Sequence, residues 1–276
     1  MSASPHEDRP SRTGQALAEA PLLEARGITK SFGHVEALRG VDFEVRHREI
    51  VALMGDNGAG KSTLVKILSG ALQPDGGEIR LDGETVTLQS PVDARAHGVE
   101  TVYQDLALAD TLDPVANLFL GRELLRSGSL GRLGFLDDKA MRRRAGDVFS
   151  SLNVPVRPEH DAVGNLSGGQ RQGIAVSRAV TWASKVLFLD EPTAALGVRQ
   201  TRNVLDLIRR VCERGVSVVL ISHSVPEVLE VADRIEVLRL GKRVDRFTQE
   251  TGTAEAVVAA LTGASDLGAE PEGEQV

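Results

Sequence analysis

The chain has 276 residues, of which 41% are hydrophobic, 26% are charged and only 3% are aromatic. This length is enough for one large domain or two small ones, with a core that aliphatic side chains must fill. The balance of 32 basic against 39 acidic residues gives a net charge of −7, which argues against a nucleic-acid-binding protein held by a bulk basic field.

Targeting and redox signals are sparse. No apolar run approaches the ~18 residues that span a bilayer, and residues 1–20 lack an apolar signal core, so we expect neither a membrane-spanning helix nor a secretory signal. The single cysteine, Cys212, excludes an internal disulfide and fits a reducing cytosol. Residues 1–21 and the acidic residues 264–276 are expected to be disordered tails.

Short alternating segments at residues 22–25 and 41–45 predict antiparallel strands that break at Gly33 and Gly40. The apolar run at 50–54 predicts a buried strand. Leu64, Ile67, Leu68 and Ala71 then recur at helical spacing. A strand, a glycine-rich loop and a helix therefore follow one another directly.

The loop between that strand and helix matches the P-loop pattern G-x-x-x-x-G-K-[ST]. Its glycines let the backbone turn successive N–H groups toward one point, which suits phosphate. Lys61 adds a charge that can reach the outer phosphates, and Ser62 offers a hydroxyl to Mg²⁺. The sequence predicts ATP with Mg²⁺ rather than a chance turn, held by Gly55, Asp56, Asn57, Gly58, Ala59, Gly60, Lys61, Ser62 and Thr63.

Further along, a hairpin is predicted from 78–81 and 84–88, and a strand at 99–104. Between about 106 and 180 the pattern favours helices and loops. One short helix is expected to include Leu118, Phe119, Leu124 and Leu125, and a second to span 137–152. Strands at 186–189 and 216–221, a helix at 199–214 and a final hairpin around Gly241 complete the pattern. This alternation predicts a parallel sheet with helices on both faces.

Two carboxylates, Asp190 and Glu191, follow the strand at 186–189. In a P-loop protein an aspartate at this place can hold Mg²⁺, and its neighbour can act as general base on an attacking water. The alternative is a polar strand end before the turn at Pro192.

The sequence LSGGQ at 166–170 precedes a helical pattern. Ser-x-x-Gln is also a helix capping box, and both interpretations can hold, because a capped helix N-terminus attracts phosphate.

With the P-loop, Gln104, LSGGQ, LFLDEP at 187–192 and His223 in this order, the chain resembles the ATP-binding subunit of ABC transporters over residues 22–250. ETVYQDLAL at 100–108, NLFLGRE at 117–123 and AALGV at 194–198 resemble the bacterial monosaccharide importers of the ribose, xylose and fructose type. Many of those subunits carry two fused ATPase domains, whereas this chain has one and so resembles the single-domain fructose-type branch. The resemblance implies an α/β P-loop NTPase core with a mainly parallel sheet, an N-terminal antiparallel β-subdomain and an inserted α-helical subdomain. It places the ABC ATPase domain at 22–263, with the core at 22–104 and 178–250 and the helical subdomain at 105–177.

The resemblance also implies roles for residues. Phe32 would stack on adenine, although a core position in the small sheet is the alternative. Gln104 would reach Mg²⁺ or the attacking water and sense the membrane partner, unless it is a plain strand end. His223 would hold the γ-phosphate and the water, although a lone histidine is usually structural. The γ-phosphate of an ATP held by a second copy would meet Ser167, Gly168, Gly169 and Gln170.

The implied function is ATP hydrolysis that powers import of a sugar, at the cytoplasmic face of the cell membrane. Two copies would pack head-to-tail and bind a permease through Gln104 and residues 105–121, with a sugar-binding protein as indirect partner and no nucleic acid. The motor does not contact the sugar, so the sequence does not name it. The family commonly carries an aspartate where this chain has Gly197. An ATP-binding regulatory or assembly module with little hydrolysis is therefore the alternative.

Overall fold

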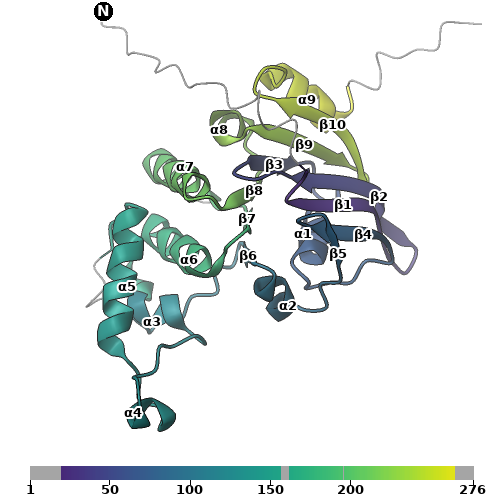
Figure 1. Cartoon of the computed structure of the whole chain (residues 1–276). Coiled ribbons are helices and arrows are strands. Elements are labelled where there is room, and N and C mark those ends of the chain that lie inside the picture. The colour runs from purple at the N-terminus through teal and green to yellow at the C-terminus, as the bar shows by residue number, and fades with distance from the viewer. Residues whose placement is uncertain (1–19, 157–161, 195, 265–276) are drawn as a thin grey trace, which may run out of the picture.

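The computed structural model describes residues 20–156, 162–194 and 196–264, so the predicted tails lie almost wholly outside the described residues. Two sheets organise the chain (Figure 1). One is antiparallel, in the order β2 (Val35–Val45), β1 (Leu23–Phe32), β4 (Gly76–Leu81) and β5 (Glu84–Val86). The other has the order β10 (Lys242–Thr248), β9 (Arg234–Arg239), β3 (Ile50–Met54), β8 (Ser217–Ile221), β7 (Val186–Asp190) and β6 (Val99–Val102). Its strands are parallel except for β10.

The helices connect and cover these strands. They are α1 (Lys61–Leu68), α2 (Pro91–Ala96), α3 (Pro114–Phe119), α4 (Ser129–Arg132), α5 (Asp138–Ser151), α6 (Gly168–Trp182), α7 (Val198–Glu213), α8 (Val225–Val231) and α9 (Ala254–Thr262), with a 3₁₀ turn at Val163–Asn165. Among the described residues, no helix has both the length and the apolar character needed to cross a membrane.

The central strand β3 separates two hydrophobic cores. Ile50, Ala52 and Met54 belong to the core shared with α3 and α5–α9. Val51 and Leu53 belong to the core shared with α1 and the antiparallel sheet. Because alternate side chains of a strand point to opposite faces, a strand buried on both faces reads as a continuous apolar run.

The predicted mainly parallel sheet and N-terminal antiparallel sheet are confirmed. The prediction of helices on both faces needs one refinement. One face is covered by helices, whereas the other is covered by α1 together with the antiparallel sheet.

Two local predictions were wrong. Strand β2 continues through Gly40, whose φ of 79° accommodates a bulge between Arg39 and Val41. The helix expected to reach Leu125 ends at Phe119, and Leu125 instead forms an isolated antiparallel bridge with Leu136. Leu120 has φ −53° and ψ 119°, and Gly121 has a φ of 74°, so the backbone leaves the helix at these two residues.

The predicted division between core and helical subdomain stays a prediction. Helix α6 runs without a break across residue 178, where the second core segment was expected to begin. Figure 1 shows α3, α4 and α5 grouped at one end of the molecule, away from the antiparallel sheet.

Candidate functional site

Several of the predicted site residues gather where parallel strands end. Strands β3, β7 and β8 are hydrogen-bonded neighbours and β6 pairs with β7, so their carboxyl ends share one edge of the sheet. The P-loop follows β3, Gln104 follows β6, Glu191 follows β7 and His223 follows β8. Ligands of open α/β sheets bind at this edge.

The P-loop leads directly into α1. Gly60 is the N-cap of this helix; it has no side chain to cap the helix, and the first turn of α1 contains no acidic residue. The N–H groups at the start of α1 therefore keep their capacity to bind an anion. Lys61 is 6% exposed, and its Nζ atom donates to the carbonyl oxygens of Gly55 at 2.6 Å and Asp56 at 3.0 Å.

Two glycines of this loop are required by their neighbours. A Cβ on Gly55, where φ is 152°, would lie 2.2 Å from the carbonyl oxygen of Leu238. A Cβ on Gly60, where φ is 103°, would lie 2.7 Å from the carbonyl oxygen of Ala37. The back of the loop is also held by Gly241, whose N–H donates to the carbonyl oxygen of Ala59 at 3.1 Å. The β9–β10 turn and β2 thus fix the shape of the loop.

Burial shifts the pKa values of two charged groups of the site in opposite directions. Burial lowers the pKa of Lys61, although the carboxylates of Glu191, Asp190 and Asp56 oppose this change. Burial raises the pKa of Asp190, and the charge of Glu191 adds to the rise. Because a buried charge is stabilised by an opposite charge, a phosphate beside Lys61 and a cation beside Asp190 would both be favoured.

Glu191 is the centre of the polar contacts. His223 Nε2 lies 2.7 Å from Glu191 Oε1, and Gln104 Nε2 donates to Glu191 Oε2 at 3.5 Å. The backbone of Glu191 has a φ of 49°, and its N–H donates to the carbonyl oxygen of Ile221 at 3.0 Å. A left-handed glutamate is uncommon, and such strain is concentrated at functional sites. The strand conformation of β7 thus ends at Asp190, one residue before Glu191.

Mg²⁺ fits the donors present. In the described part of the chain, no group of three or more His, Cys, Asp or Glu residues could hold a metal ion by itself. Mg²⁺ does not need such a cage, because it is usually bound by one or two carboxylates together with substrate phosphates and water. The side chains of Ser62, Asp190 and Gln104 supply hydroxyl, carboxylate and amide oxygens, and Asp190 carries the raised pKa described above.

The LSGGQ segment forms the capping box that the sequence predicted. The Ser167 N–H donates to Gln170 Oε1 at 3.0 Å, and the Gln170 N–H donates to Ser167 Oγ at 3.4 Å. A Cβ on Gly169 would lie 3.2 Å from Cγ of Gln200 in α7, so close packing against Gln200 favours glycine there. Among the described residues, no hydrogen bond or ion pair joins residues 167–170 to the P-loop of the same chain.

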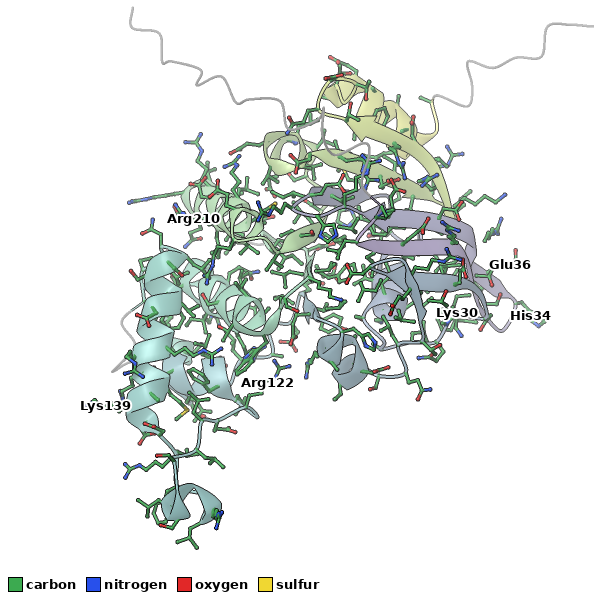
Figure 2. The ribbon with its side chains drawn as sticks, in the orientation of Figure 1. Lys30, His34, Glu36, Arg122, Lys139 and Arg210 are labelled. Carbon is green, nitrogen blue, oxygen red and sulfur yellow. The ribbon has the colours of Figure 1, made fainter. Side chains whose placement is uncertain are left out.

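Phe32 lies at the end of β1, and its side chain is 51% exposed. The core position that the sequence left open for Phe32 is therefore wrong. Lys30 Nζ lies 5.8 Å from the centroid of the Phe32 ring, and Figure 2 shows Lys30 with His34 and Glu36 at this rim of the antiparallel sheet. Half of the Phe32 side chain is therefore open to solvent, with the Lys30 ammonium over the ring.

One residue with a clear structural link to the site was missed from the sequence. Arg178 of α6 donates from Nη1 to the carbonyl oxygen of Ala107 at 2.7 Å and from Nη2 to that of Leu106 at 2.9 Å. Burial lowers the pKa of Arg178. The helix that begins with LSGGQ is thus fastened to the chain just beyond Gln104. A single arginine in a helical pattern gives no signal of such a contact.

The ABC transporter family profile matches residues 38–194, which is more than half of the chain. The chain belongs to the ABC transporter family. It is 48% identical over 252 residues to the fructose import ATP-binding protein FrcA of Rhizobium meliloti, a match that covers 91% of this chain and 97% of FrcA. It is 45% identical over 241 residues to the xylose/arabinose import ATP-binding protein XylG of Sulfolobus acidocaldarius, covering 87% of this chain and 94% of XylG. It is also 45% identical to the ribose import ATP-binding protein RbsA 1 of Rubrobacter xylanophilus. That match covers 86% of this chain but only 46% of RbsA 1.

Solved structures show the same cassette fold. The ADP conformation of an ATP-binding cassette of an ABC transporter matches with a TM-score of 0.77 at 22% identity. The match covers 91% of the present chain and 100% of the solved one. A dimeric post-hydrolysis cassette bound to ADP and Pi has a TM-score of 0.69 at 24% identity, covering 82% and 98%.

Proposed function

We propose that this chain binds ATP with Mg²⁺ and hydrolyses it to power the import of a monosaccharide through a permease. The observation that supports hydrolysis is the meeting of Lys61 with Asp190, Glu191, Gln104 and His223 at one edge of the sheet. The names of relatives that cover nearly the whole chain, fructose import and xylose/arabinose import, support the substrate class. The particular sugar is not assigned.

The roles of the residues follow from their chemistry. Lys61 and the N–H groups of residues 55–63 hold the phosphates, and Phe32 stacks on adenine. Mg²⁺, when bound, neutralises charge on the phosphate oxygens. Glu191 accepts a proton from the attacking water, and the 2.7 Å contact with His223 fixes the orientation of its carboxylate. Gln104 donates to the other oxygen of the same carboxylate.

The active form is a head-to-tail pair of copies. Within one chain, the described residues show no bond between LSGGQ and the P-loop, so the LSGGQ of a second copy completes each ATP site. The dimeric state named for a cassette of the same fold supports this arrangement. A C₂ pairing is self-complementary and forms two equal sites.

The permease contact is assigned to residues 105–121. A groove of about 170 Å³ lies beside α3 and is lined from this segment by Leu112, Asp113, Val115, Ala116, Phe119 and Leu120. Its lining is mainly apolar and also holds three acids and one base, Asp113, Glu123, Asp138 and Arg142, which suits an amphipathic segment of a permease. The chain then works at the cytoplasmic face of the membrane, and a sugar-binding protein acts through the permease.

The test is sugar uptake by proteoliposomes that contain the chain, its permease and its sugar-binding protein. Uptake of fructose, xylose or ribose with ATP inside, and none with ADP, is the expected result. ATP hydrolysis without uptake of any monosaccharide would overturn the substrate class. ATP binding without hydrolysis in the full assembly would favour the regulatory module suggested by Gly197, which caps α7 without a side chain.

A further inference from the structure

A short arm projects from the molecule between α3 and α5. We define the arm as residues 124–136, with α4 at its tip, and Figure 1 shows α4 standing clear of the other elements. The two ends of the arm are joined by the Leu125–Leu136 bridge and by the Arg126 N–H, which donates to the carbonyl oxygen of Phe135 at 2.9 Å. No residue of α4 is buried. The arm is a closed hairpin in which Leu124, at the base, packs against the core, whereas α4 at the tip has no buried residue.

The side chains of the arm are unusually apolar for an exposed projection. Thirteen large hydrophobic side chains are exposed among the described residues, and the arm holds five of them. These are Leu125, Leu130, Leu133, Phe135 and Leu136, with Leu133 at 73% exposure. Water-exposed apolar side chains gathered in one place mark a contact surface.

The charge of the arm is opposite to that of the protein. Arg126 and Arg132 are its only charged residues. Residues 124–143 carry five basic and two acidic side chains, in a chain whose net charge is −7. Lys139, labelled in Figure 2, is exposed on α5 just behind the arm. Of the two acids, Asp137 is engaged as the N-cap of α5. The apolar tip therefore has a basic rim.

We propose that the arm is a membrane-interface anchor that inserts its leucine and phenylalanine side chains among the headgroups of an anionic bilayer. Leucine and phenylalanine beside arginine is the composition of segments that lie in that interface. Anionic lipids attract basic residues near the surface. A projecting tip with apolar side chains and no concavity suits a deformable lipid surface better than a shaped protein partner.

The position of the arm agrees with this assignment. The arm follows closely on residues 105–121, and Leu136 at its base lines the groove beside α3. If that groove holds the permease, the arm lies on the membrane side of the molecule. The support from position rests on the proposed function. The support from the charge and the exposure of the arm is independent of it.

The test is co-sedimentation of the full chain, without nucleotide or permease, with two kinds of vesicle. One is pure phosphatidylcholine and the other contains phosphatidylglycerol. We expect the chain to bind the anionic vesicles at least about tenfold more tightly than the phosphatidylcholine vesicles, because two arginines lie at the surface. This binding should weaken in high salt. Leu133→Asp/Phe135→Asp should lose about tenfold or more of this binding. Val258→Asp, which alters an exposed apolar residue of α9 away from the arm, should bind like the parent chain.

Several results would overturn the anchor. Equal binding to both vesicles, no binding to either, or binding unchanged in Leu133→Asp/Phe135→Asp would each exclude it. If the arm variants bind both vesicles as the parent chain does but fail to assemble with the permease, the arm is a protein contact instead. As a second measurement, a polarity-sensitive dye on Ser129→Cys should shift to the blue on anionic vesicles only. ATP affinity, measured on the same variants, separates failure of the anchor from failure of the proposed ATP site.

Discussion

His223 Nε2 and Glu191 Oε1 lie 2.7 Å apart at the ends of neighbouring parallel strands, β8 and β7. The left-handed backbone of Glu191 turns its carboxylate into this contact, while Asp190 one residue earlier keeps the strand conformation. Two adjacent carboxylates are thus given different neighbours. Asp190 shares the buried surroundings of Lys61, and Glu191 faces the imidazole and the amide of Gln104.

This arrangement predicts a separation of binding from hydrolysis in Glu191→Gln. The amide keeps the size of the side chain but cannot accept the proton of the attacking water, so kcat for ATP hydrolysis should fall by about 10²-fold or more. ATP affinity should change by less than about threefold, because Lys61 and the P-loop are untouched. ATP should also hold the variant as a dimer. Steady-state hydrolysis, ATP titration and light scattering check these points, with exposed Glu213→Gln as the control for loss of one negative charge. Hydrolysis at the parent rate would contradict the base assignment.

The meeting of these side chains could be predicted from the sequence, because they stand at or after the ends of strands. Each of Lys61, Asp190 and His223 follows a buried apolar run, and parallel strands bring such ends together. The strain at Glu191 was not predictable, since a positive φ at a non-glycine residue leaves no mark in the pattern. The arm was misjudged for a related reason. Leu124 and Leu125 resemble the continuation of α3, but Gly121 breaks the backbone before them.

The second prediction concerns the charge at the phosphates. Lys61→Ala should lower ATP affinity by about 10–100-fold, which corresponds to ~1.4–2.7 kcal/mol. Lys66→Ala offers a matched control, because Lys66 lies on the same helix but is exposed. Its removal should change affinity by less than about twofold. Isothermal titration with ATP and Mg²⁺ gives both values. Equal effects of the two substitutions would mean that general charge, rather than the buried Lys61, holds the nucleotide.

The third prediction compares two glycines of the P-loop. Gly58 and Gly60 both have positive φ, at 83° and 103°, so alanine at either position carries a backbone cost of about 1 kcal/mol. Only at Gly60 would the new Cβ also meet the carbonyl oxygen of Ala37, at 2.7 Å; at Gly58 it would meet open space. Crowding adds about 1–3 kcal/mol. The free energy of unfolding, measured in urea, should therefore be clearly lower for Gly60→Ala than for Gly58→Ala. A larger loss for Gly58→Ala would show that the loop is not braced as described.

The last prediction concerns Arg178, a positioning residue that does not touch the reacting atoms. Its planar guanidinium donates to two carbonyl oxygens at once, those of Leu106 and Ala107, at 2.9 and 2.7 Å. Ala107 itself has a φ of 48°, so this segment needs an outside contact to hold its shape. Lysine carries the same charge but cannot reproduce the two-pronged contact. Arg178→Lys should therefore free the segment that begins beside Gln104.

The expected kinetic result is a fall in kcat of about threefold to tenfold, or ~0.7–1.4 kcal/mol in the barrier, with little change in KM for ATP. Hydrogen exchange should rise at residues 104–108 and stay constant in the P-loop. Arg202→Lys, an exposed arginine of α7, serves as the control. A merely structural role for Arg178 would lower the melting temperature without changing kcat of the folded protein. A rise in KM at constant kcat would instead place Arg178 in nucleotide binding. A fall in kcat at nearly constant KM is expected only if the helix that begins with LSGGQ also holds Gln104 in position.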